Sequence, residues 1–172
     1  MSTSSQRGSD TTGKIYECTG ALWKFNRPVT RSELLRVAEE AVTSIYCAGE
    51  PMSDPVMVGQ WLQCKYAELQ NETFGVMFLD SRHRLIAFER LFEGSIAGAE
   101  VHPRVVVQRA LANNAAAVIL SHNHPSGVSE PSTADRSITL RLRDALALVD
   151  VRVLDHFVVG QTVVSMAARG WL

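Results

Sequence analysis

The sequence has few cysteines, almost no net charge and no long hydrophobic run. Its three cysteines, Cys18, Cys47 and Cys64, form neither a Cys-x-x-Cys pair nor a disulfide framework, which favours a reducing cytoplasm. No apolar segment approaches the ~20 residues that a membrane-spanning helix needs. Residues 1–10 also lack the hydrophobic core of a signal peptide. We therefore expect a cytoplasmic protein that does not enter a membrane.

The near-neutral charge also limits the possible partners. The formal net charge is −1 over 172 residues, whereas a nucleic-acid-binding domain usually carries a basic stripe or a high isoelectric point. Arginines occur within residues 82–84 and 136–143, and a solvated surface explains them best. The charge therefore gives only weak support to nucleic acid as a partner.

The composition is that of an ordinary globular protein. Hydrophobic residues make up 46% and charged residues 20% of the chain, and the length suits one compact domain with additional residues at an end. We expect residues 1–30 to form a disordered or irregular tail, residues 31–52 an amphipathic helix and a linker, and residues 53–172 the main domain.

Hydrophobic periodicity predicts strands that alternate with helices. Apolar residues spaced three and four apart indicate helices, and short runs rich in β-branched residues indicate strands. We expect helices over residues 32–46, 54–69, 103–113 and 133–149, and strands over residues 74–80, 85–92, 115–120, 151–160 and 162–165. This order indicates an α/β fold in which helices flank a mixed β-sheet.

The residues that carry chemistry lie between positions 121 and 135. His122 and His124 follow the apolar run 115–120, and in an extended chain residues two apart point to the same side. Two imidazoles and the carboxylate of Asp135 are ligands that Zn2+ accepts, and three protein ligands leave a fourth position for water. The stretch therefore predicts a Zn2+ site formed by His122, His124 and Asp135.

Ser132 and Asp135 also have a purely structural interpretation. Ser-x-x-Asp before an amphipathic run is typical of a capping box, with Asp in place of the usual Glu, and by itself this pair caps helices more often than it binds metals. Its spacing from His-x-His-Pro favours metal ligation. The two roles are compatible, because fixing the start of the helix also fixes where Asp135 points.

The motif resembles a known family. Residues 122–135 contain His-x-His-Pro and, five residues later, Pro-Ser-x-x-Asp, which is similar to the signature of JAMM/MPN metalloproteases. Residues 101–104, 114–127 and 150–156 resemble the RadC branch of that family, and the similarity covers about residues 53–172. The resemblance implies the MPN/JAMM architecture, which is like that of cytidine deaminases. Full-length RadC proteins carry a helix-hairpin-helix-like segment before this domain, and because no such segment is evident here, we expect a short stand-alone RadC form.

The resemblance also implies an activity and two further site residues. Proteins of this fold are Zn2+-dependent hydrolases of peptide or isopeptide amides, in which a serine lies beside the reacting carbonyl and a glutamate takes a proton from water. These roles fall to Ser132 and Glu72. Glu72 is followed by Thr-Phe-Gly and an apolar run, which resembles the family's E-x-x-G pattern at a strand start. Glu89, Glu93 and Glu100 are the competitors for the role of base.

The remaining histidines suggest other roles. His83 is expected in an exposed turn and His102 at a helix start. His156 is either a polar residue on a core strand that needs a hydrogen-bond partner or, as the resemblance implies, a residue that supports the metal ligands.

Two other classes of function can be compared with a hydrolase. A zinc nucleobase deaminase needs His-x-Glu and Pro-Cys-x-x-Cys, and neither motif is present. The alternative is a non-catalytic DNA repair or recombination accessory of the RadC family, which the balanced charge supports weakly. We expect a protein or peptide substrate, and no residue pattern predicts an oligomeric state.

Overall fold

The structure is a computed structural model that describes residues 15–19, 22–47, 51–94 and 101–172. The elements within these residues follow in the order β1 (Tyr16–Thr19), β2 (Leu22–Phe25), α1 (Arg31–Cys47), α2 (Pro55–Tyr66), β3 (Thr73–Leu79), β4 (Leu85–Glu93), α3 (Pro103–Ala112), β5 (Ala117–Asn123), α4 (Thr133–Ala147), β6 (Arg152–Val159) and β7 (Val163–Ser165). Within the described residues, no helix is long and apolar enough to span a bilayer.

A five-stranded mixed sheet forms the centre of the protein. Its strand order is β4-β3-β5-β6-β7, with β5 and β6 parallel and the other neighbours antiparallel. β5 therefore lies in the middle of the sheet and is buried along its whole length. The predicted α/β class, a mixed sheet flanked by helices, is confirmed.

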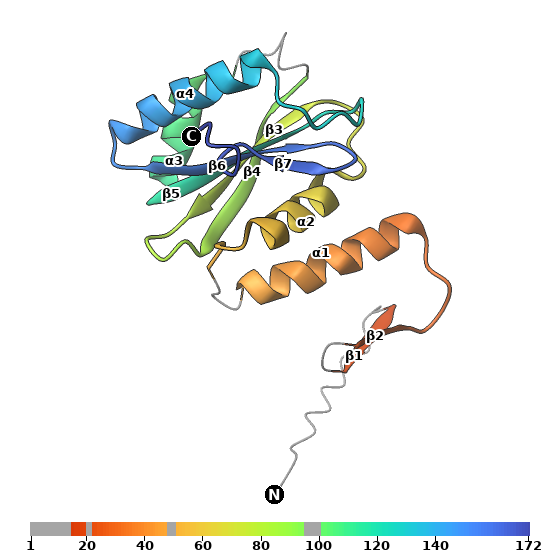
Figure 1. Cartoon of the computed structure of the whole chain (residues 1–172). Coiled ribbons are helices and arrows are strands. Elements are labelled where there is room, and N and C mark those ends of the chain that lie inside the picture. The colour runs from red at the N-terminus through yellow and green to blue at the C-terminus, as the bar shows by residue number, and fades with distance from the viewer. Residues whose placement is uncertain (1–14, 20–21, 48–50, 95–100) are drawn as a thin grey trace, which may run out of the picture.

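Helices cover both faces of the sheet (Figure 1). The core on one face joins α2 to the sheet and includes Trp61, Leu62, Met77, Ile119 and Phe157. The core on the other face joins α3 and α4 to the sheet and includes Phe78, Val106, Leu120, Leu142 and Leu146. Because side chains alternate along a strand, β3 and β5 supply both cores at once. β5 is thereby held from both sides, which gives the residues at its end a rigid support.

Local signals account for where α2 begins. The carboxylate of Asp54 accepts hydrogen bonds from the backbone N–H groups of Val56 and Met57, and Pro55 occupies the first turn. The helix ends at Tyr66, three residues before the expected end near Leu69. Asp54 and Pro55 together therefore fix the start of α2.

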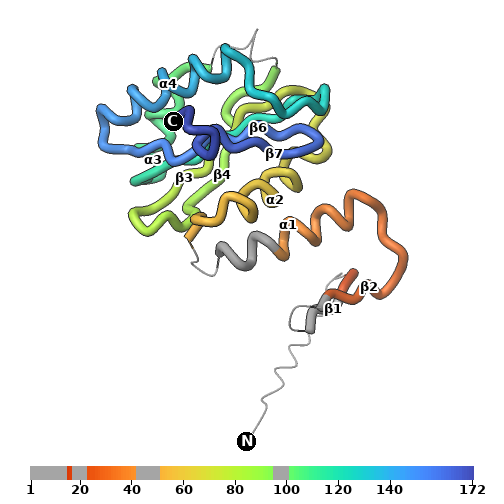
Figure 2. Tube along the Cα trace, viewed as in Figure 1, coloured from red at the N-terminus to blue at the C-terminus, as the bar shows by residue number. Residues whose placement is uncertain are grey.

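The elements before α2 differ in part from expectation. Residues 1–30 were expected to be irregular, whereas β1 and β2 form an antiparallel hairpin; residues 1–14 lie outside the described part. Thr30 caps α1, since its hydroxyl accepts from the N–H of Glu33 while the Glu33 carboxylate accepts from the N–H of Thr30. Figure 2 shows the trace of α1 beside α2, where Nζ of Lys65 lies 2.5 Å from the carboxylate of Glu39.

Candidate metal centre

β5 brings the two histidines of the motif to one place. His122 belongs to the strand and is completely buried. His124 follows directly, and its backbone N–H donates to the carbonyl of Val159 at 2.8 Å, so the pairing with β6 continues past the end of the strand. The two Nε2 atoms lie 3.0 Å apart. The two rings therefore point to one spot, as the alternation of an extended chain predicts.

Asp135 reaches the same spot from the first turn of α4. Its Oδ1 lies 3.4 Å from Nε2 of His122 and its Oδ2 lies 3.8 Å from Nε2 of His124. The carboxylate also accepts from the N–H of Ser132 at 2.6 Å, and the Ser132 hydroxyl accepts from the N–H of Asp135 at 3.1 Å. Asp135 is thus a capping-box residue that also faces both imidazoles, so the structural role is present together with the arrangement needed for a ligand.

Hydrogen bonds determine which nitrogen of His124 is available. Its Nδ1 lies 2.6 Å from the carbonyl oxygen of Val128. A carbonyl can only accept, so Nδ1 carries the proton of the neutral ring and Nε2 keeps a lone pair. The free nitrogen of His124 is therefore the one that faces His122.

A buried chain of hydrogen bonds also leaves Nε2 as the available nitrogen of His122. The hydroxyl of Thr139 donates to the carbonyl of Asp135 at 2.5 Å, and it therefore accepts from Nδ1 of His156, 2.6 Å away. Nε2 of His156 is then an acceptor, and it receives the proton of Nδ1 of His122 at 2.8 Å. Nε2 of His122 is left with a lone pair. The chain links the β5 ligand to the helix that carries Asp135.

The electrostatics of this cluster favour a bound cation. Burial lowers the pKa of His122 to about 4, outweighing the nearby carboxylate of Asp135, so this ring is neutral at pH 7. Burial also lowers the pKa of His156. When the His124 ring is neutral as well, two nitrogen lone pairs and a carboxylate face one another at 3.0 to 3.8 Å. Such groups repel one another unless a positive charge lies among them.

The donor set fits Zn2+. Ligand atoms that lie 2.0–2.2 Å from a tetrahedral Zn2+ are roughly 3.4 Å apart, and the three separations here are 3.0, 3.4 and 3.8 Å. Neutral imidazoles with a carboxylate are also the ligand types that this ion accepts. His122, His124 and Asp135 could therefore hold Zn2+ with little rearrangement.

Glu72 brings a second carboxylate to the site. One of its oxygens and a ring nitrogen of each of His122 and His124 lie within 4.8 Å of one another. The side chain of Asn123, located between the two histidines in sequence, accepts from the N–H of Thr73 at 2.8 Å and donates to the carbonyl of Asn71 at 3.1 Å. Asn123 thus holds the backbone on both sides of Glu72. At this distance Glu72 is suited to be a fourth ligand or a base beside a water in the fourth position.

The other candidate glutamates have different surroundings. Glu89 accepts from the guanidinium of Arg109 and from Asn113, and the Arg109 hydrogen bond is the main cause that lowers the pKa of Glu89. Glu93 is exposed at the end of β4. Glu100 lies outside the described residues. Among the described glutamates, Glu72 is the one grouped with the two histidines.

Two contributors to the site, Asn123 and Thr139, were not predicted from the sequence. Thr139 follows Asp135 by one helical turn, and this spacing on α4 was a signal that could have identified it. Asn123 lies between the histidines and points away from them, so only its contacts with residues of a distant segment reveal its position. The predicted support of a ligand by His156 corresponds to its bond with His122.

Comparison with known proteins agrees with this geometry. The model of a family described as RadC-like JAB domain matches residues 52–171. A UPF0758 protein of Xanthomonas oryzae pv. oryzae (strain PXO99A) is 55% identical over 139 residues, which cover 80% of this chain and 62% of the relative. A UPF0758 protein of Thioalkalivibrio sulfidiphilus (strain HL-EbGR7) is 54% identical over 139 residues, which cover 81% and 62%. The chain spans less than two thirds of the length of these relatives. The predicted RadC resemblance is confirmed, and the chain belongs to the family of proteins with a RadC-like JAB domain.

Proposed function

We propose that the chain is a zinc-dependent hydrolase of the JAMM type that cleaves a peptide or isopeptide amide bond. The observation that carries the proposal is the convergence of the Nε2 atoms of His122 and His124 with the carboxylate of Asp135. His122, His124 and Asp135 would hold the ion. When bound, Zn2+ lowers the pKa of water from 15.7 to roughly 7 and polarises a carbonyl.

Glu72 is the proposed general base. Its carboxylate accepts a proton from the attacking water and delivers it to the leaving amine, which is typically worth about 100- to 10,000-fold in rate. A base must remain within reach of the reacting atoms throughout this transfer. The two hydrogen bonds of Asn123 to the residues on either side of Glu72 support such a fixed position.

Ser132 is the proposed oxyanion donor. Its oxygen accepts from the N–H of Asp135, and the residue is exposed at the start of α4. Because a hydroxyl both accepts and donates, the Ser132 hydrogen can point to a carbonyl oxygen that becomes negative during attack. The capping bond would then orient the donor.

The decisive experiment combines metal analysis with a peptide cleavage screen. Gently purified protein should contain about one Zn2+ per chain, as a three-ligand catalytic site predicts, and His122→Ala and Asp135→Ala should lose it. Glu72→Gln should keep zinc and lose cleavage, because the amide cannot take the proton. Glu93→Gln is the matched control and should keep both zinc and cleavage. Glu93 is an exposed glutamate at the end of β4, and it pairs with Thr73, the residue next to Glu72. Metal-free wild-type protein or full activity of Glu72→Gln would contradict the proposal.

A DNA-binding accessory predicts a different set of results. Its affinity for DNA would fall steeply with salt, because bound phosphates release counterions, and no zinc-dependent cleavage would accompany it. Measuring DNA affinity over a range of salt concentrations, beside the cleavage screen, separates this alternative from the hydrolase.

A further inference from the structure

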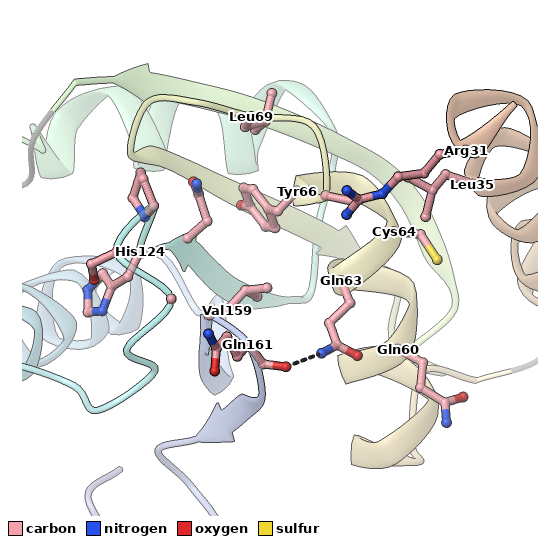
Figure 3. Close-up of a pocket in the computed structure, with 16 residues that line it drawn as sticks. Arg31, Leu35, Gln60, Gln63, Cys64, Tyr66, Leu69, His124, Val159 and Gln161 are labelled. Atoms are coloured by element: carbon pink, nitrogen blue, oxygen red, sulfur yellow. Dashed lines mark hydrogen bonds between the residues drawn. The ribbon is translucent and has the colours of Figure 1, made fainter.

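A groove of about 740 Å³ extends from His124, one of the candidate metal ligands, to the N-terminal helix α1. His124 lies at one end and Arg31, the first residue of α1, lies at the other (Figure 3). Between them, α2 forms one wall and the loop 124–127 with the turn after β6 forms the opposite wall. The groove therefore combines residues of the RadC-like domain with a helix outside the matched residues 52–171.

The lining of the groove suits a polypeptide in an extended conformation. Primary amides of Gln60, Gln63 and Gln161 line it together with the apolar side chains of Leu35 and Leu69. Gln63 also donates to the carbonyl of Gln161 at 3.4 Å, a bond that joins the two walls. Amides donate and accept hydrogen bonds as an extended backbone requires, and the apolar patches accept side chains.

The charge of the groove is one-sided. Arg31 and His124 are the basic residues that line the groove, and no described aspartate or glutamate lines it. Within the described residues, no carboxylate forms a salt bridge with Arg31. The neighbouring cations are paired, as Arg27 with Glu33, Arg36 with Glu40 and Lys65 with Glu39.

Two glutamates of α1 and one that follows α2 line a separate cavity of about 420 Å³. Glu33, Glu39 and Glu68 line that cavity. Arg36, Lys65 and Arg90 line the same cavity, so its charges balance. The groove beside His124 differs, because Arg31 lines it without any described carboxylate.

We infer that this groove binds the part of a polypeptide substrate that flanks the scissile amide, and that Arg31 selects a carboxylate on that segment. The inference rests on the proposed hydrolase function for the location of the scissile bond. A guanidinium recognises a carboxylate by charge and by paired hydrogen bonds. The helix before the RadC-like domain would then determine which peptides reach the metal centre.

Binding to the inactive Glu72→Gln protein loaded with Zn2+ tests this inference without cleavage. The probes are fluorescent peptides of one sequence, with C-terminal amides, in which glutamate replaces glutamine at one position at a time; a second set has a free C-terminus. We expect at least one glutamate peptide or free carboxylate to bind about 2- to 10-fold more tightly than its neutral partner, as for partly exposed charged pairs. The preference should shrink as salt increases. The two sets distinguish a side-chain carboxylate from a terminal one.

Substitutions of two arginines on the same helix provide the control. Arg31→Gln should abolish the preference and Arg31→Lys should retain much of it, whereas Arg36→Gln should leave it unchanged because Arg36 pairs with Glu40 and lines the other cavity. Equal binding of the acidic and neutral peptides, absence of peptide binding, or a preference that survives Arg31→Gln would overturn the inference. Zinc-dependent cleavage without any preference for acidic peptides would overturn the inference about the groove and leave the hydrolase proposal intact. An acidic preference without any zinc-dependent cleavage would instead contradict the hydrolase proposal.

Discussion

Nδ1 of His122 and Nε2 of His156 lie 2.8 Å apart in a core where both side chains are completely buried. This single contact has two effects. It holds the His122 ring in one orientation, and it keeps the proton on Nδ1 so that Nε2 is available to a metal. His156, which is completely buried, therefore positions a candidate ligand.

Replacing His156 with alanine should weaken zinc binding about 10- to 100-fold, the usual effect of losing a partner of a metal-ligating histidine. Competition with a chelator of known affinity measures it. Asn123→Ala is the matched control, because Asn123 lies between the two histidines but holds the Glu72 segment. We expect that variant to retain zinc and to lose cleavage. Equal zinc affinity of His156→Ala and the wild type would exclude the positioning role.

At the scale of single elements, the first turn of α4 performs two tasks. The reciprocal bonds between Ser132 and Asp135 begin the helix, and they also aim the Asp135 carboxylate at His122 and His124. Stability and the proposed catalysis would consequently depend on the same turn. The effects of Ser132 on stability and on catalysis can be separated. Glycine and alanine at this position both lack the hydroxyl, but glycine is the better helix cap.

Ser132→Ala should lower the free energy of unfolding by about 1 kcal/mol, whereas Ser132→Gly should lower it by only a few tenths of that. Urea denaturation of the zinc-free proteins measures both. If the hydroxyl is the oxyanion donor, both variants should lose about 100- to 1,000-fold in kcat. Activity that follows stability, with Ser132→Gly close to wild type, would show that the hydroxyl acts only as a cap.

At the scale of the whole molecule, the metal centre joins elements that are separate in sequence. His122 lies on the central strand β5, Asp135 on α4, and Glu72 immediately before β3. An ion bound by the folded state alone would tie the sheet to the helix layer. It would therefore stabilise the entire domain.

Free Zn2+ at 100 times its dissociation constant should raise the free energy of unfolding by about 2.7 kcal/mol. Thermal unfolding with zinc and with a chelator provides the measurement, and a higher Tm with zinc is expected. His122→Ala should show the same Tm under both conditions. A wild-type Tm that does not respond to zinc would mean that the folded protein does not bind the ion.

Much of the framework was predictable because its signals are local. The periods of apolar residues indicated the strands and helices of the α/β domain, including a helix that starts near residue 54. The hairpin of β1 and β2 was missed, since strands of four residues are too short to establish a period. The spacing of His122, His124 and Asp135 was likewise a local signal, because one strand end and one helix start supply all three.

The tertiary structure decided the rest. Asn123 meets Asn71 and Thr73 because β5 pairs with β3, and His156 meets His122 because β6 lies on the other side of β5. Arg31 reaches the groove only through the packing of α1 on α2. The sequence by itself determined the elements and the chemical types at the metal centre, since periodicity and capping depend on neighbours in the chain. The partners of those groups depend on strand register and helix packing between segments far apart in sequence, and local patterns do not specify these.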